Sequence, residues 1–147
     1  IIVKEAEEEY IYCTELKTID DKTNMLMKHL RHAWEYHSFK VGCGSYIDME
    51  KIKQRQFQQY DGLYSVIEQQ PLQSDMRICE RGLYLYAYHI GTWDELSSLY
   101  EKILNYTKQH HYHLSGYAYE RGISELSLLH RSEYVTEIKI KCEKMKE

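Results

Sequence analysis

The chain has 147 residues, which fits one domain with a real core. Its 19 Lys and Arg residues against 23 Asp and Glu residues give a formal net charge of −4, so it lacks the basic face that phosphate binding requires. Hydrophobic residues make up 43%, which excludes a disordered chain. No apolar run is as long as a membrane span, and no signal-peptide pattern is present. We therefore expect a cytoplasmic protein that has no membrane partner and does not hold DNA by itself.

The first half is predicted to contain a strand, a helix and two further strands. A strand-like run covers residues 1–12, and it opens without an initiating Met, so we expect that the chain was cut from a longer protein. Asp20 or Thr23 could cap a helix. Its apolar face would carry Leu26, Leu30, Ala33, Trp34 and His37, with Trp34 in the core. Residues 42–49 and 63–68 are the two later strand candidates.

Pro71 is the single proline, and it lies in the polar stretch 69–75, which is typical of a connector. It divides the chain into two similar halves, so we predict one domain built from pseudo-repeats 1–70 and 76–143. A shift of 73 residues maps Tyr46 onto Tyr119, and it maps two leucines of the first predicted helix onto apolar residues of the second. Few positions match, so the duplication is a hypothesis.

The second half begins with a predicted long strand over residues 77–89. Leu83, Leu85 and Ala87 fall on one face of it, and Tyr84, Tyr86 and Tyr88 fall on the other. Gly91 ends the strand, and Thr92 and Glu95 have the spacing of a capping box.

A helix should follow the capping box and end near His110, with an apolar face at helical spacing that consists of Leu96, Leu99, Tyr100, Ile103, Leu104 and Thr107. Residues 114–120 and 134–142 are then strands. The predicted fold class is α+β: duplicated strand–helix–strand–strand units form a mostly antiparallel sheet, with two helices on one face.

Fifteen tyrosines against two phenylalanines are the clearest functional signal in the composition. Tyrosine has an apolar body and a hydroxyl that needs a partner when it is buried, which suits the wall of a pocket for an aromatic or cationic molecule. The alternative is that these tyrosines simply cover a sheet, because tyrosine is a good strand former.

Glu120 follows two strand tyrosines and is the one place where the sequence indicates chemistry. A buried carboxylate needs a partner, and a cationic ligand could supply it. The alternative is a surface glutamate paired with Arg121. Strict alternation places Tyr119 and Glu120 on opposite faces of their strand, so both could enter one pocket only if a bulge intervened.

Neither metal nor cofactor is expected. His29 and His32 have a spacing that could share a metal, but no third ligand is evident, so a solvated helix face is the preferred interpretation. The four cysteines (Cys13, Cys43, Cys79 and Cys142) occur singly, and we favour reduced thiols over disulfides. No catalytic triad order, P-loop or dinucleotide-binding glycine motif is present, and we assign no catalytic residue.

The segment 81–142 resembles the GyrI-like effector-binding domain, found at the C-terminus of BmrR-type MerR-family transcriptional regulators. The resemblance rests on Ala-Tyr-His-Ile-Gly-Thr-Trp at 87–93, Gly-Tyr-Ala-Tyr-Glu at 116–120 and a closing strand at 134–140. It covers about 60 residues well. It implies a ligand pocket between two strand–helix–strand–strand units, with a glutamate at its floor in the position of Glu120.

The resemblance implies a small-molecule sensing domain of a multidrug-type transcriptional regulator, which binds lipophilic, cationic or aromatic ligands. The residues assigned to ligand binding are Glu120, Tyr46, Tyr86, Tyr88, Trp93, Tyr119 and Tyr134. Trp93 could equally staple its helix to the sheet. DNA would be bound only through an N-terminal region outside this chain, and we expect the full-length protein to be a homodimer.

Two alternatives stay open. Some GyrI-like proteins are hydrolases of strained electrophilic small molecules that use a pocket glutamate with a tyrosine, and Glu120 with a nearby tyrosine fits that description. Others are standalone modules that act on protein partners. We expect a binding protein rather than an enzyme.

Overall fold

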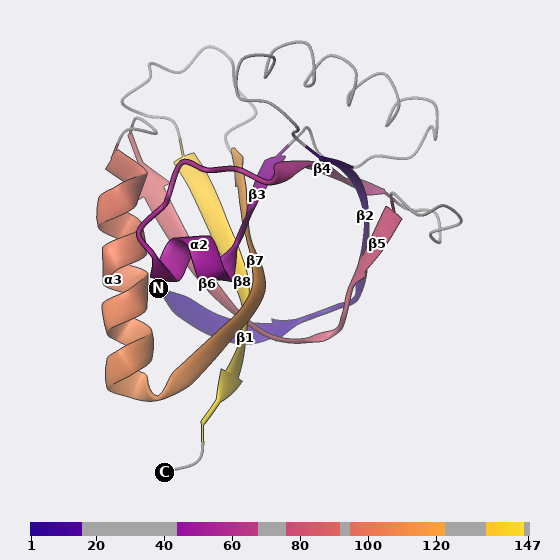
Figure 1. Ribbon diagram of the computed structural model, residues 1–147. Helices are drawn as coiled ribbons and strands as arrows, with labels where there is room; N and C mark the ends of the chain where they lie inside the picture. The colour runs from indigo at the N-terminus through magenta and orange to yellow at the C-terminus, as the bar shows by residue number, and fades with distance from the viewer. Residues whose placement is uncertain (16–43, 68–75, 92–94, 123–134, 146–147) are drawn as a thin grey trace.

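The computed structural model describes residues 1–15, 44–67, 76–91, 95–122 and 135–145. In these residues eight strands form one sheet, accompanied by two helices (Figure 1). The strands are β1 (Ile2–Ala6), β2 (Glu9–Glu15), β3 (Gly44–Asp48), β4 (Gly62–Ile67), β5 (Met76–Cys79), β6 (Gly82–Ile90), β7 (Tyr112–Gly122) and β8 (Val135–Lys144). The helices are α2 (Met49–Lys53) and α3 (Leu96–His110). All the neighbouring strands are antiparallel, which confirms the predicted α+β class.

The two halves of the chain contribute strands in the same arrangement. The sheet order is β1-β6-β8-β7-β3-β4-β2-β5, so the second half supplies β6-β8-β7 and the first half supplies β2-β4-β3. The halves meet where β3 pairs with β7, and Tyr46 lies opposite Tyr119 in that pair. These two tyrosines are 73 residues apart, the same shift that relates the halves in sequence. An internal duplication would produce this arrangement, and it stays a prediction.

The two edge strands are exchanged between the halves. β1 precedes β2 in sequence but pairs with β6, and β5 precedes β6 but pairs with β2. The predictions of continuous strands over 1–12 and 77–89 were therefore wrong, because the first run divides at residues 7–8 and the second at residues 80–81, each into an edge strand and an inner strand. Both parts keep the two-residue alternation of a strand, so the pattern alone does not reveal the break.

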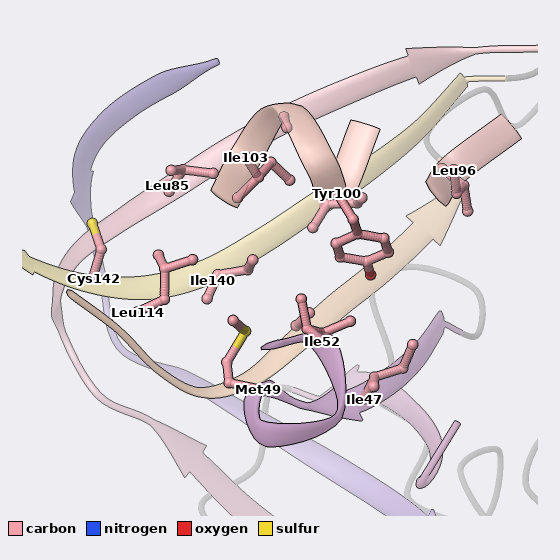
Figure 2. Packing of buried hydrophobic residues seen from close by; sticks show 13 residues of the cluster. Ile47, Met49, Ile52, Leu85, Leu96, Tyr100, Ile103, Leu114, Ile140 and Cys142 are labelled. Carbon is pink, nitrogen blue, oxygen red and sulfur yellow. The ribbon is translucent and has the colours of Figure 1, made fainter. Parts of the chain in front are cut away.

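The main core lies between α3 and the sheet. Leu96, Tyr100 and Ile103 of α3 are at most 3% exposed, and they pack on buried residues of β6, β7 and β8 (Figure 2). Leu85 and Ala87 of β6 belong to this core, whereas the tyrosines that alternate with them face the other side of the sheet. The predicted faces of the helix and of the strand are confirmed.

Residues next to α3 determine where the helix begins and ends. His111 adopts the left-handed conformation with φ 59°, and its N–H bonds to the carbonyl of Thr107, so the helix ends at His110 as predicted. At the other end Glu95 is the N-cap residue, but its side chain makes no capping hydrogen bond. One Glu95 carboxylate oxygen instead lies 3.3 Å from Nε2 of His89. Thr92, the other member of the predicted capping box, lies outside the described residues.

The short helix α2 was not predicted, and it begins where the sequence suggested the end of a strand. Asp48 caps it by accepting a hydrogen bond from the N–H of Glu50 at 2.9 Å, and Met49 and Ile52 enter the core. The helix predicted to start at Asp20 or Thr23 lies outside the described residues. None of the helices that the structure describes has the length and apolar character needed to cross a membrane.

Candidate functional site

A cavity of about 460 Å³ lies on the face of the sheet opposite α3, and both halves of the chain contribute to it. This size is in the range of small-molecule sites. Its uncharged wall includes Ile11, Tyr64, Val66, Cys79, Tyr86 and Tyr119. Its charged residues are Lys4, Glu5, Glu7, Glu8, Glu9, Arg121, Glu137 and Lys139. The sheet curves strongly, so β2, β4 and β5 arch away from α3 and leave this face concave (Figure 1).

Lysine side chains lie over the tyrosines of β6. Nζ of Lys139 is 4.6 Å from the ring centroid of Tyr84 and 5.7 Å from that of Tyr86, and Nζ of Lys4 is 4.7 Å from the Tyr86 ring. These distances are in the range of cation–π attraction. The tyrosine faces on this side of the sheet therefore already attract cations, and a bound cation could use the same chemistry.

Two of the cavity's cationic side chains are neutralised by carboxylates. Nζ of Lys139 lies 2.7 Å from a carboxylate oxygen of Glu9, and Nε of Arg121 lies 3.0 Å from one of Glu137. Five glutamates against three cationic side chains line the cavity, so the acidic groups are in excess. The potential in the cavity therefore favours positively charged molecules.

Tyrosine rings pack edge to face at the inner end of the cavity. The ring centroids of Tyr64 and Tyr119 are 5.1 Å apart at 74°, and Tyr46 lies behind Tyr119 at 6.3 Å. Burial raises the pKa of Tyr46 to about 12 and also raises the pKa values of Tyr64 and Tyr119, so all three rings stay neutral at physiological pH. Gly44 makes this packing possible, because a Cβ there would collide with the Tyr64 ring.

Glu120 forms a second cluster, on the α3 side of β7. Its carboxylate is 6% exposed and accepts hydrogen bonds from the hydroxyl of Tyr60, at 2.8 Å, and from that of Tyr100. Phe57 stacks on the Tyr100 ring at 5.2 Å. Burial, followed by the Glu120 carboxylate, raises the pKa values of Tyr60 and Tyr100, which keeps both phenols available as donors.

The loop that carries Tyr60 is held by Asp61. One carboxylate oxygen of Asp61 accepts from the N–H of Asp48 at 2.7 Å, and the other accepts from Nζ of Lys51 at 2.6 Å. Lys51 also donates to the carbonyl of Gln59 at 3.3 Å. These bonds tie the loop to α2 and thereby orient the Tyr60 hydroxyl toward Glu120.

The predicted site residues do not all meet at one place. Tyr86 and Tyr119 line the cavity, Tyr46 lies behind Tyr119, and Tyr88 is 40% exposed on the same face of β6 as Tyr86. Glu120 faces α3 instead. The bulge in β7 lies between Ser115 and Ala118, before Tyr119, so alternation holds afterwards and separates Tyr119 from Glu120. Trp93 and Tyr134 lie outside the described residues. The ligand-binding roles of all seven stay predictions.

Sequence reasoning missed several residues of both clusters. Tyr60 was not singled out, and Tyr100 was assigned only to the helix core; the cationic residues Lys139 and Arg121 were not assigned to a pocket. The one available signal was the surplus of tyrosine, which does not say which ring faces which carboxylate. Within the described residues no three His, Cys, Asp or Glu side chains are grouped so as to hold a metal ion.

Comparison with solved structures finds the same fold in several proteins of low sequence identity. The C-terminal domain of EcmrR matches with a TM-score of 0.67 at 14% identity, over 98% of this chain and 97% of that one. EcmrR in a DNA complex matches with a TM-score of 0.73 at 13% identity, and this chain spans 57% of its length.

Two further solved structures share the fold, a hydrolase and a protein with a bound organic cation. A hydrolase from Listeria innocua matches with a TM-score of 0.63 at 9% identity, covering 97% of this chain and 91% of that one. SAV2435 bound to tetraphenylphosphonium matches with a TM-score of 0.53 at 9% identity, covering 97% and 93%. No family model and no curated protein matches the sequence. The chain has the fold of these proteins, the GyrI-like fold that the resemblance implied.

Proposed function

We propose that this chain is the ligand-binding domain of a MerR-type transcriptional regulator and that its ligands are lipophilic, aromatic cations. The observation that carries the proposal is the cavity between the halves, where three tyrosines line the wall and carboxylates outnumber cationic groups by five to three. In the full-length protein, which we expect to be a homodimer, the bound ligand would act on a DNA-binding region outside this chain.

Size, chemistry and fold all support a cationic aromatic ligand. A cavity of about 460 Å³ matches a drug-sized molecule. Tyrosine faces attract cations by roughly 0.5–2 kcal/mol each, and the exposed carboxylates of Glu5, Glu7 and Glu8 attract them from solvent. The similarly folded SAV2435 was solved with tetraphenylphosphonium, and EcmrR was solved with DNA. These relatives suggest the ligand class and the signalling partner.

Tetraphenylphosphonium and tetraphenylborate have nearly the same shape and opposite charges, so together they test the proposal. We expect titration calorimetry to detect binding of the cation and little or no binding of the anion, because the acidic excess favours positive charge. Added salt should weaken binding of the cation, since the rim carboxylates are exposed. Equal affinity for the two ions, or no binding of the cation, would contradict the proposal.

Matched variants test which residues hold the cation. Tyr86→Leu should weaken tetraphenylphosphonium binding several-fold because it removes a cavity ring, whereas Tyr112→Leu, outside the cavity, should leave it unchanged. Glu120→Gln distinguishes binding in the cavity from binding beside Glu120. The affinity for tetraphenylphosphonium should not change if the cation is held in the cavity. A selective loss of affinity for the cation would instead indicate binding beside Glu120, as the family resemblance implies.

A second candidate function is hydrolysis of a strained electrophile at Glu120. The favouring observation is a buried carboxylate that two phenol hydroxyls contact, together with the Listeria hydrolase of similar fold. The carboxylate could accept a proton from attacking water while a phenol donates one to the leaving oxygen. Incubation with styrene oxide and detection of the diol would test this. Equal turnover by the wild-type protein and Glu120→Gln would exclude the role of Glu120.

A further inference from the structure

Arg77 differs from Lys139 and Arg121, the two cationic side chains on the concave face of the sheet that are paired with carboxylates. Lys139 and Arg121 each have a glutamate within 3.0 Å. For Arg77 there is no ion-pair partner among the residues that the structure describes, and its Nη1 atom is buried without a hydrogen-bond acceptor. A buried donor with no acceptor costs free energy, so such a group calls for a partner.

The guanidinium of Arg77 lies against two tyrosine rings. Its central carbon is 5.1 Å from the ring centroid of Tyr46 and 5.1 Å from that of Tyr117, and these two rings meet edge to face at 5.1 Å. Among the described residues, the titratable groups that act most on it are the Cys13 thiol and the phenols of Tyr46, Tyr117 and Tyr119. All four groups are ordinarily neutral at pH 7. The rings hold the guanidinium in place, and none of these neighbours brings a negative charge.

Arg77 lies beside the proposed ligand cavity. In the pairing of β5 with β2 it is opposite Ile11, and Cys79 lies two residues further along the same face of β5. Both Ile11 and Cys79 line the cavity. Tyr119, which also lines the cavity, packs against Tyr46 and Tyr117, the two rings that hold the guanidinium. A group at this end of the cavity therefore approaches Arg77 past Tyr119.

We propose that Arg77 is the binding site for an oxyanion of the ligand, such as a carboxylate or sulfonate. This inference rests on the proposed function and narrows its ligand class to aromatic molecules with a positive charge at one end and an acidic group at the other. The positive group lies near the glutamates of the rim, and the acidic group accepts hydrogen bonds from Arg77. Guanidinium groups pair with such oxyanions through planar, charge-assisted hydrogen bonds.

Tetramethylrhodamine and its methyl ester test this inference, because both carry the cationic xanthene and only the free acid carries a carboxylate. Fluorescence polarisation should give about tenfold tighter binding of the acid, the size of a charge-assisted hydrogen bond. The acidic excess of the cavity alone would favour the ester. An ester that binds as well as the acid, or an acid that does not bind, overturns the inference.

Two variants of Arg77 and a charge-matched control test whether Arg77 binds the acidic group of the ligand or only stabilises the fold. Arg77→Met should abolish the preference for the acid while leaving affinity for the ester within about twofold, and Arg77→Lys should retain part of the preference. Arg55→Met removes the same charge from a surface pair with Glu101 and should change neither affinity. A preference for the acid that survives in Arg77→Met overturns the inference, and so does a preference that is lost equally in Arg55→Met.

Should Arg77→Met fail to fold, the comparison of the two dyes on the wild-type protein still tests the inference. Tetraphenylphosphonium binding without a preference for the acid would leave the proposed function intact, whereas no binding of any cation would overturn both.

Discussion

Replacing Ile103 with alanine should lower the free energy of unfolding by about 2–5 kcal/mol, because the substitution opens a cavity in a closely packed core. Ile103 is 0% exposed and lies on the face of α3 that packs on the sheet (Figure 2). Leu85, Ile138 and Ile140 of the facing strands are also fully buried. They come from strands paired on both sides, so they have little freedom to move in and fill the space.

Chemical denaturation monitored by circular dichroism measures this loss, and Leu99→Ala is the matched control. Leu99 is on the same helix but is only partly buried, so its truncation should cost less than that of Ile103. A loss below about 1 kcal/mol for Ile103→Ala, or equal losses for the two variants, would mean that α3 does not pack on the sheet as described.

Tyr100→Phe should destabilise the protein by about 1.5–3 kcal/mol, although it removes a single oxygen atom. The Tyr100 hydroxyl is fully buried and donates to the carboxylate of Glu120, which is itself 6% exposed. Hydrogen bonds to charged groups are stronger than neutral ones, and water cannot easily replace a donor at a buried site. The carboxylate would keep the hydroxyl of Tyr60 as a donor.

The control for this variant is Tyr106→Phe, on the same helix. The Tyr106 ring stacks on Tyr112 near the helix end, so removal of its hydroxyl should be close to neutral. Combining Tyr100→Phe with Glu120→Gln completes a double-mutant cycle by denaturation. We expect Tyr100→Phe to cost less in the Glu120→Gln background, since the charged acceptor is gone. Strictly additive losses would show that the two side chains do not interact.

For the Glu120 cluster, the sequence predicted the need for a partner but not which residues would supply it. Glu120 was recognised as a carboxylate that needs a partner if buried, and the structure buries it. The partners supplied are phenols, from Tyr60, which is 60 residues away, and Tyr100, which is 20 residues away. Neither separation has a signature in the sequence, because side chains distant along the chain meet only when the strands and α3 assemble.

The sequence by itself determined the local features of this protein. The alternation in β6 separated its core residues from its tyrosines, the helical spacing identified the buried face of α3, and His110 marked the end of that helix. These features depend on the two-residue period of a strand and the 3.6-residue period of a helix, which operate over a few neighbouring residues. They were enough to predict the α+β class with an antiparallel sheet.

Only the tertiary structure decided which strands are neighbours and which charges meet. The exchange of β1 and β5 between the halves brings Glu9 within 2.7 Å of Lys139, 130 residues away. The exchanged strands also contribute residues to the cavity lining, and β5 places Arg77 against the rings of Tyr46 and Tyr117. The alternation of residues along a strand identifies its two faces but not the strand that lies beside it. Strand pairing depends on the burial and hydrogen bonding of the whole sheet.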